Sequence, residues 1–353
     1  MNKKLISIAI AAAVAAPLAA QAGSITVPNM DITMSGGITG AYIYQTDTKL
    51  DQYVVEDALL DFSSEAKAGG MGFNLGVGTL AGNSLVAPLN VIGGGNAVIG
   101  STPADVGVQY GWVTVMPTDG LKVDAGLLAT NIGYEVFPSY GNGNMLRGLV
   151  WNNQPAYYTG ARATYSTGGM SVYVEGSKQG ANSNGQAIGA SATMGSVNGS
   201  ISYFNDEDNK SIVDIIASTK AGNVTLAANI DYFTKSTRQK NLAPAGADDN
   251  AFGIALYATV PMGDMAELPM RLEYVNDGTS NLYGLNPGGI GGNTVSKTAL
   301  SFTISPTYNF TNATFVRAEL AYVSTDKKTM FVDDKGALTD TNMTIGAQAG
   351  VRF

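Results

Sequence analysis

The sequence contains no histidine and no cysteine, and only 14% of its 353 residues are charged. Catalytic triads, zinc sites and most general bases that work near neutral pH use imidazole, so hydrolases of these types are excluded. Hydrolysis by carboxylates alone is not excluded. Without cysteine the chain is not a disulfide-stapled secreted module. We also find no motif for a cofactor or a metal ion, and we predict that the chain uses neither.

Long apolar runs are scarce as well. The only one follows the basic residues Lys3 and Lys4, spans residues 5–20 and ends in Ala-Gln-Ala at 20–22. These features are typical of a signal peptide, so we assign residues 1–22 to one and residues 23–353 to the exported domain. Cleavage leaves 18 basic and 28 acidic side chains, a net charge of −10, which argues against nucleic acid as a partner.

From residue 31 onward the apolar pattern has a period of two, which places successive side chains on opposite faces of a β-strand. The last segment is the clearest case, because apolar residues from Met343 to Phe353 alternate with polar or small ones from Thr344 to Arg352. In a soluble sandwich the apolar face would form the core. In a transmembrane barrel it would face lipid, and the polar face would line the lumen.

The same pattern recurs in sixteen segments of mostly nine to fifteen residues, long enough for the roughly 9 to 11 residues that a strand needs to cross a bilayer. The expected strands are residues 31–45, 53–67, 70–80, 106–116, 121–129, 156–167, 170–178, 186–195, 198–205, 210–219, 223–234, 250–261, 267–276, 295–308, 313–324 and 340–353.

The links between these segments decide between the two folds because they alternate in length. Even-numbered segments are followed by tight turns such as Gly168-Gly169, whereas most odd-numbered segments are followed by longer links, up to residues 81–105 and 130–155. Short periplasmic turns opposite long extracellular loops are typical of outer-membrane barrels, and an even strand number closes the sheet. We therefore predict an all-β fold, a transmembrane antiparallel β-barrel of about 16 strands.

Aromatic side chains support this fold, since many lie near strand ends on the expected lipid faces, where interfacial girdles form. Aromatic residues favour strands in any fold, so they add weight without deciding. The residues placed on the lipid faces are Tyr42, Tyr44, Phe73, Tyr110, Trp112, Tyr157, Tyr165, Tyr203, Tyr232, Tyr257, Tyr274, Phe302, Tyr308, Tyr322 and Phe353.

Charged side chains of both signs fall on the opposite parity, facing the lumen. An Arg or Lys that faced lipid at the midplane would cost about 2–4 kcal/mol, so this one-sided placement is informative. The charges either filter small hydrated solutes or form ion pairs that hold the wall together, and a cluster of the four arginines would attract anions despite the net acidity. The set includes Asp57, Asp61, Asp124, Arg162, Glu175, Asp214, Asp231, Arg271, Glu273, Arg317, Glu319 and Arg352.

The link at 130–155 is too long for a simple turn and contains Tyr134, Phe137, Tyr140 and Trp151. Long loops in compact folds are usually functional or disordered, and the aromatic content argues against disorder. We expect this link either to fold inward and narrow the lumen or to pack over the barrel mouth as a lid.

Several motifs lie around this link: LKVDAGL at 121–127, Gly-Tyr-Glu at 133–135, Arg147, and PAYYTGARATY at 155–165. With Arg-Leu-Glu-Tyr from 271 and Arg-Ala-Glu-Leu from 317, they resemble the OmpL-like β-barrel porin-2 family. The resemblance spans most of the exported domain and implies a pore, with Glu135 and Arg147 as constriction residues. The family's Ser-Arg-Ser is Leu-Arg-Gly at 146–148 here, so both serines are lost. The terminal Phe353 resembles the aromatic residue by which outer-membrane barrels are recognised for assembly.

Together these features predict a porin of the Gram-negative outer membrane that lets ions and small hydrophilic solutes diffuse passively through a charged, water-filled lumen. The expected partners are outer-membrane lipid, these solutes and, in a homotrimer, further copies of the chain. One alternative is a structural or adhesive barrel whose loops block the lumen. A barrel enzyme is disfavoured, because surface proteases and lipases typically use histidine.

Overall fold

The computed structural model describes residues 24–27, 30–80, 85, 106–152, 154–179, 183–286 and 295–353. The expected signal peptide, residues 1–22, lies outside these ranges. The first described segment, β1 (Ser24–Val27), pairs antiparallel with the start of the first wall strand.

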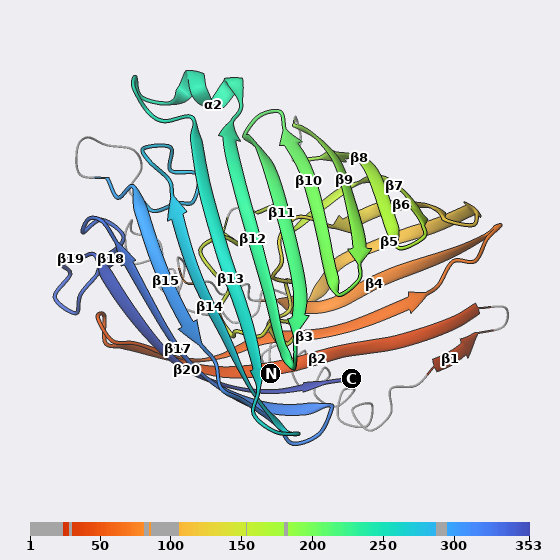
Figure 1. The fold of residues 1–353 in the computed structure, drawn as a ribbon, viewed down its shortest axis with the longest axis horizontal. Helices are drawn as coiled ribbons and strands as arrows, with labels where there is room; N and C mark the ends of the chain where they lie inside the picture. The colour runs from red at the N-terminus through yellow and green to blue at the C-terminus, as the bar shows by residue number, and fades with distance from the viewer. Residues whose placement is uncertain are drawn as a thin grey trace, which may run out of the picture.

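The wall is a closed antiparallel barrel of sixteen strands (Figure 1). Each wall strand pairs with the next one along the chain, and the last, β20, pairs with β2, so the sheet has no open edge. A closed sheet satisfies the backbone polar groups between its strands, as a membrane-spanning sheet must. The wall strands are β2 (Met30–Gln45), β3 (Leu50–Ser64), β4 (Gly70–Leu80), β5 (Gly107–Thr118), β6 (Leu121–Ala129), β7 (Tyr157–Thr167), β8 (Met170–Lys178), β9 (Asn184–Met194), β10 (Val197–Asp206), β11 (Lys210–Ala221), β12 (Val224–Lys235), β13 (Asn250–Pro261), β14 (Ala266–Asn276), β15 (Thr298–Ile304) with its continuation β16 (Thr307–Asn309), β17 (Thr314–Thr325) and β20 (Thr341–Arg352).

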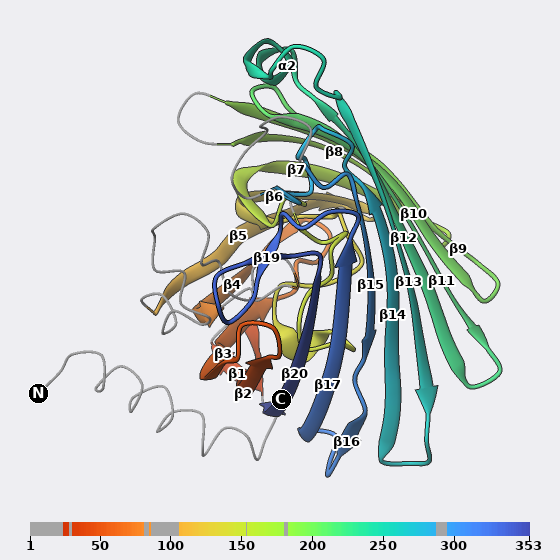
Figure 2. The ribbon, with the colours of Figure 1, turned by 90° about the vertical axis from the view of Figure 1, so that its left-hand side faces the viewer.

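A few short elements lie in the connections. They are the 3₁₀ turn η1 (Ser139–Gly141), the helix α2 (Thr237–Leu242) and the hairpin of β18 (Phe331–Val332) and β19 (Leu338–Thr339). Helix α2 lies beyond the ends of β12 and β13, opposite the tight turn that joins β13 to β14 (Figure 2). Within the described ranges no helix is long and apolar enough to cross a membrane.

The predicted barrel is confirmed, and most strand bounds agree within a few residues. The expected strand 53–67 begins and ends earlier, at Leu50 and Ser64. The expected strand 295–308 is interrupted after Ile304, because Pro306 has no N–H to donate to the ladder.

From β4 onward, longer and shorter connections alternate, whereas the first two do not follow the prediction, because residues 65–69 between β3 and β4 form a longer link than residues 46–49 between β2 and β3. Strands β7 and β8 are joined by Gly168 and Gly169 alone, with φ angles of 55° and 80° that only glycine adopts readily. Connections on the other end include residues 130–156 and 236–249. The link expected at 81–105 lies outside the described residues except for Leu85.

The two faces of the wall also follow the predicted alternation. On β20, Thr344 and Gln348 are buried inside the barrel, whereas Ile345 is exposed on its outer surface. Leu272 on β14 and Leu300 on β15 are likewise exposed on the outside. This outer apolar surface is the one that lipid covers in an outer-membrane barrel.

Four aromatic residues predicted to face lipid lie inside the barrel instead: Tyr110, Trp112, Tyr157 and Tyr257. Tyr157, for example, packs against Phe137 of the link 130–156, with ring centroids 5.2 Å apart. The prediction was wrong because it assumed that only polar side chains line the lumen. The link brings apolar groups into the lumen, and wall aromatics pack against them.

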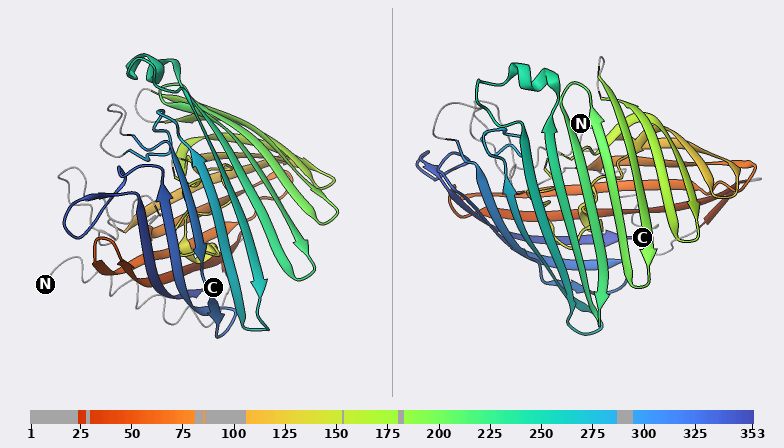
Figure 3. Two further views of the ribbon diagram at one scale, coloured as in Figure 1. Left: turned by 60° about the vertical axis from the view of Figure 1, so that its left-hand side comes forward. Right: turned by 45° about the horizontal axis from the view of Figure 1, so that its top comes forward.

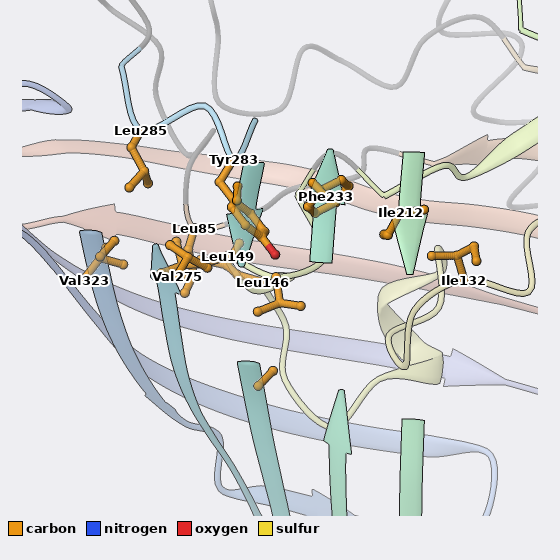
Figure 4. Packing of buried hydrophobic residues seen from close by; sticks show 14 of the residues in the cluster. Leu85, Ile132, Leu146, Leu149, Ile212, Phe233, Val275, Tyr283, Leu285 and Val323 are labelled. Atoms are coloured by element: carbon orange, nitrogen blue, oxygen red, sulfur yellow. The ribbon is translucent and has the colours of Figure 1, made fainter. Parts of the chain in front are cut away.

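An apolar core lies inside the barrel (Figure 4) and includes side chains of most wall strands. Inward-facing side chains of β11, β12, β14 and β17 meet side chains of the link 130–156 and of residues 277–286. The rings of Phe233 and Tyr283 meet edge-on with centroids 5.0 Å apart. Members of the core include Leu85, Ile132, Leu146, Leu149, Ile212, Phe233, Val275, Tyr283, Leu285 and Val323. Such packing excludes water from the part of the lumen that the core fills.

Candidate functional site

The link between β6 and β7, residues 130–156, lies inside the barrel (Figure 3), and we call it the inward loop. It bonds to inward-facing residues of β3, β14, β17 and β20. Several of these, such as Arg271 and Glu319, lie in the middle of their strands. Of the two placements expected from the sequence, the structure therefore has the inward one and not the lid over the mouth.

Three carboxylates of the wall hold the inward loop by its backbone N–H groups. Asp57, Glu319 and Glu273 accept hydrogen bonds from the N–H groups of positions 139, 146 and 150, at 2.8, 3.0 and 3.0 Å. All three side chains are buried. Hydrogen bonds to an ionised acceptor are roughly twice as strong as neutral ones, so these contacts fix the loop firmly.

Three arginines of the wall hold the loop by its carbonyl groups. Arg271, Arg317 and Arg352 donate to the carbonyl oxygens of positions 146, 142 and 140, at 2.8, 2.8 and 3.2 Å. The predicted lumen charges thus bind both kinds of polar group in the loop backbone, acids at its N–H groups and arginines at its C=O groups, and β14 and β17 each carry one charge of either sign. We call these six side chains the docking charges.

Glu135, one of the two predicted constriction residues, points into the protein. Its carboxylate accepts a hydrogen bond from the Gly148 N–H at 2.8 Å and forms an ion pair with Arg271. Arg271 also lies 3.1 Å from Glu273, so one buried guanidinium serves two carboxylates. Burial raises the pKa of Glu135, and the nearby Arg271 opposes that rise. The ion pair therefore has a large desolvation cost to offset.

Arg147, the other predicted constriction residue, is also buried, at 1% exposure. Its guanidinium lies over the rings of Phe137 and Trp151, 5.5 and 5.6 Å from their centroids. Cation–π contacts of this kind are stronger when desolvated. Arg147 therefore organises the aromatic part of the loop, and the structure does not pair it with Glu135.

The other predicted lumen charges bond mainly within the wall. Arg162 and Glu175 form an ion pair at 2.7 Å. Asp124 accepts a hydrogen bond from position 114 at 2.6 Å, and Asp61 accepts one from Tyr110. Of the four predicted arginines, Arg162 lies apart on β7. Arg317 and Arg352 lie on the paired strands β17 and β20, and both guanidinium groups lie over the ring of Phe315, 5.1 and 5.5 Å from its centroid.

Asp214 and Asp231 face each other across β11 and β12 and hold the two ends of the inward loop. Gln154 near the end of the loop donates to Asp231 at 2.6 Å, and Asn229 donates to Asp214 at 2.5 Å. Near the start of the loop, the N–H of Gly133 donates to Asp214 at 3.3 Å. The ends of the inward loop are therefore held by amide side chains together with the two carboxylates.

Three further residues take part in the contacts between the wall and the inward loop and were not predicted from the sequence: Glu56, Ser139 and Gln348. Gln348 donates to the Ser139 hydroxyl at 2.8 Å and also to Glu56. Glu56 is buried beside Asp57 because a bulge shifts the β2–β3 register between Thr39 and Gly40. Strict alternation places Glu56 outside, and nothing in the sequence marks the bulge.

The terminal Phe353 joins the first and last wall strands. Its N–H donates to the carbonyl of Gly36, and its carbonyl accepts from the Gly36 N–H, both at 3.0 Å. This pair extends the β2–β20 ladder to the end of the chain. The role of Phe353 in assembly stays a prediction.

Replacing Ser139 with alanine is expected to loosen this end of the inward loop by about 1–3 kcal/mol, because the hydroxyl bonds of buried Asp57 and Gln348 lose their partner. Hydrogen exchange of the backbone amides at 139–142 should accelerate accordingly. Ser191→Ala, at an exposed serine of β9, is the control. Equal exchange in both variants would contradict the anchoring role.

Comparison with solved structures shows the same fold in outer-membrane proteins. The outer membrane channel DcaP of Acinetobacter baumannii superposes with a TM-score of 0.62 at 9% identity, over 94% of this chain and 100% of that one. OmpT of Vibrio cholerae gives 0.62 at 12%, over 94% and 100%. The anion-selective porin from Comamonas acidovorans gives 0.59 at 13%, over 92% and 100%. At these identities the likeness establishes the fold alone.

No curated protein matches the sequence significantly. The family model of the OmpL-like β-barrel porin-2 matches residues 31–353, which is the whole barrel and its inward loop. The match agrees with the motifs around the loop and with the closed sixteen-stranded wall. The chain therefore belongs to the OmpL-like β-barrel porin-2 family of outer-membrane porins.

Proposed function

We propose that this porin lets ions and small hydrophilic solutes diffuse passively across the outer membrane, and that the inward loop sets the width of their path. One observation carries the second part: side chains from opposite sides of the wall, Asp57 on β3 and Asp214 on β11, both accept hydrogen bonds from the backbone of the same loop. A loop tied across a lumen in this way narrows it. Within this proposal Glu135 and Arg147 act on the constriction by fixing the shape of the loop.

We also propose that the chain is a channel and has no catalytic activity. The sequence has no histidine, and the described residues include no group of three acidic side chains placed to hold a metal ion. The docking charges bond to the loop backbone, which supports a structural role for them rather than a catalytic one.

Channel recordings test the proposal. The purified protein in planar bilayers should give a conductance that rises with salt concentration. A variant in which a short Gly-Ser linker replaces residues 134–150 should give a several-fold larger single-channel conductance, because the constriction is gone. Shortening the connection 236–249, which carries α2 at the barrel rim, is the control and should leave conductance near the original value.

Two outcomes would overturn the proposal. A folded barrel that conducts at no voltage would rule out diffusion and favour the structural barrel with a blocked lumen. An unchanged conductance after the loop replacement would rule out the constriction.

We further propose that residues 1–22 are removed on export, that Phe353 directs assembly, and that the mature barrel forms a homotrimer in outer-membrane lipid. A trimer form of Vibrio cholerae OmpT is among the structures with this fold, and the exposed apolar outer surface suits both lipid and a neighbouring barrel. Light scattering of the detergent-solubilised protein should give three times the chain mass. A monomer mass would count against the trimer.

A further inference from the structure

The solvent-exposed edge of the inward loop, between residues 134 and 143, carries no exposed charged side chain. Tyr134 and Val136 are 37% and 48% exposed, whereas Glu135 between them is 8% exposed. Gly141 and Gly143 are exposed as well. The groups that a solute meets along this edge are therefore aromatic, aliphatic or backbone.

A run of aromatic rings continues from this edge onto the wall. Phe137 packs against Tyr157 with centroids 5.2 Å apart, Tyr157 stacks on Tyr110 at 5.3 Å, and Tyr110 lies 5.8 Å from Trp112. All four side chains are partly exposed. Residues of β5, β7 and the loop, distant in sequence, thus form one row of rings inside the barrel.

On the other side of Val136 a second aromatic pair borders a cavity. The rings of Tyr134 and Tyr257 lie 4.5 Å apart, beside a cavity of about 250 Å³. Asn142 and Thr259 also line it, and both are neutral hydrogen-bonding groups. We call the row of rings and this pair together the aromatic strip: Trp112, Tyr110, Tyr157, Phe137, Tyr134 and Tyr257.

Among the described residues, the charged side chains that border the aromatic strip are each engaged by a protein partner. Asp61 accepts a hydrogen bond from Tyr110, and Glu135 is paired with Arg271. Arg147 lies over the ring of Phe137. A charged solute would have to displace one of these contacts, whereas a neutral solute would not.

We propose that the aromatic strip is a binding track for neutral saccharides. A pyranose ring has an apolar C–H face that packs on an aromatic ring, and a rim of hydroxyl groups that bonds to tyrosine hydroxyls and to Thr259. Aromatic and apolar lining with a few neutral polar groups is the usual composition of a small-molecule site. This inference rests on the proposed diffusion function and names the solute class that the channel would favour.

The test uses maltotriose as the probe, with sorbitol as a linear polyol control for viscosity. Maltotriose should reduce the potassium chloride current of single channels in a saturable way, and sorbitol should not. Tyr134→Leu keeps an apolar side chain but removes the ring and the hydroxyl, so the half-blocking concentration should rise roughly tenfold. Tyr203→Leu, at a tyrosine on the outer surface, is the matched control.

A second measurement does not depend on conductance. The only tryptophans of the chain are Trp112, in the strip, and Trp151, beside Phe137. Maltotriose should therefore change the tryptophan emission of the detergent-solubilised barrel.

The outcomes separate the two proposals. Normal potassium chloride conductance with neither block nor emission change would overturn the saccharide track and leave the diffusion function standing. A barrel that does not conduct would overturn the diffusion function and with it the track. Equal block in Tyr134→Leu and the unmodified chain, or stronger block by glucose 6-phosphate than by glucose, would overturn a neutral aromatic track.

Discussion

Replacing Arg271 with methionine is expected to release the inward loop and to raise single-channel conductance several-fold. Arg271 is fully buried, forms ion pairs with Glu135 and Glu273, and donates to the carbonyl of position 146. Methionine fills a similar volume but leaves two buried carboxylates without their counter-charge. Breaking a buried pair in this way costs about 3–5 kcal/mol. We expect this cost to exceed that of replacing any docking charge that makes a single contact with the loop.

Trypsin provides a direct measure of this release. Arg147 is the only lysine or arginine of the inward loop and is 1% exposed when the loop is docked. Cleavage after Arg147 should therefore be slow in the unmodified barrel and fast in Arg271→Met. The fragments identify the site by mass.

Two further variants separate docking from general stability. Lys122→Met removes a side chain that is 48% exposed and paired with Asp124, where an ion pair contributes about 0–1 kcal/mol, so conductance and cleavage should not change. Adding Glu135→Gln and Glu273→Gln to Arg271→Met removes the uncompensated charges and should restore part of the docking. An undisturbed loop in Arg271→Met would refute the central role of the guanidinium.

The wall of this barrel could be predicted from sequence because strand parity is a local property. Alternation puts Thr344 and Gln348 inside and Ile345 outside, and burial in the closed barrel follows that pattern. Tight glycine turns such as Gly168-Gly169 fixed the hairpins in the same way. Both signals act over a few residues, so they need no knowledge of what lies across the lumen.

The use of the lumen charges could not be predicted, because it depends on contacts between distant parts of the chain. Asp57 and position 139 are 82 residues apart, and Glu319 and position 146 are 173 apart. Parity places Asp57 and Glu319 inside but does not say that a loop backbone meets them there. Glu56 was missed for a different reason, since a single bulge reverses its face.

One departure from the family pattern has a physical explanation in this packing. The family resemblance expects serine at position 148, and this chain has glycine. A Cβ atom at Gly148 would lie 2.0 Å from a carboxylate oxygen of Glu273, while the Gly148 N–H bonds to Glu135. The loop backbone thus passes between two carboxylates with no room for a side chain.

Gly148→Ala is therefore expected to undock the middle of the inward loop, with faster tryptic cleavage after Arg147 and a larger single-channel conductance. Overpacking of this kind costs about 1–3 kcal/mol, and the displaced Glu273 also risks its hydrogen bond from position 150. Gly176→Ala on β8, where an added Cβ would meet nothing within 4 Å, is the matched control.

A rescue identifies the clash as the cause. Glu273→Asp shortens the carboxylate side chain by one methylene and withdraws it from position 148, so the double variant with Gly148→Ala should dock better than Gly148→Ala alone. If the double variant were no better docked than Gly148→Ala, the steric explanation would be wrong. If Gly148→Ala itself left cleavage and conductance unchanged, the loop would tolerate a side chain at position 148. The clash with Glu273 would then not explain why this chain has glycine where the family resemblance expects serine.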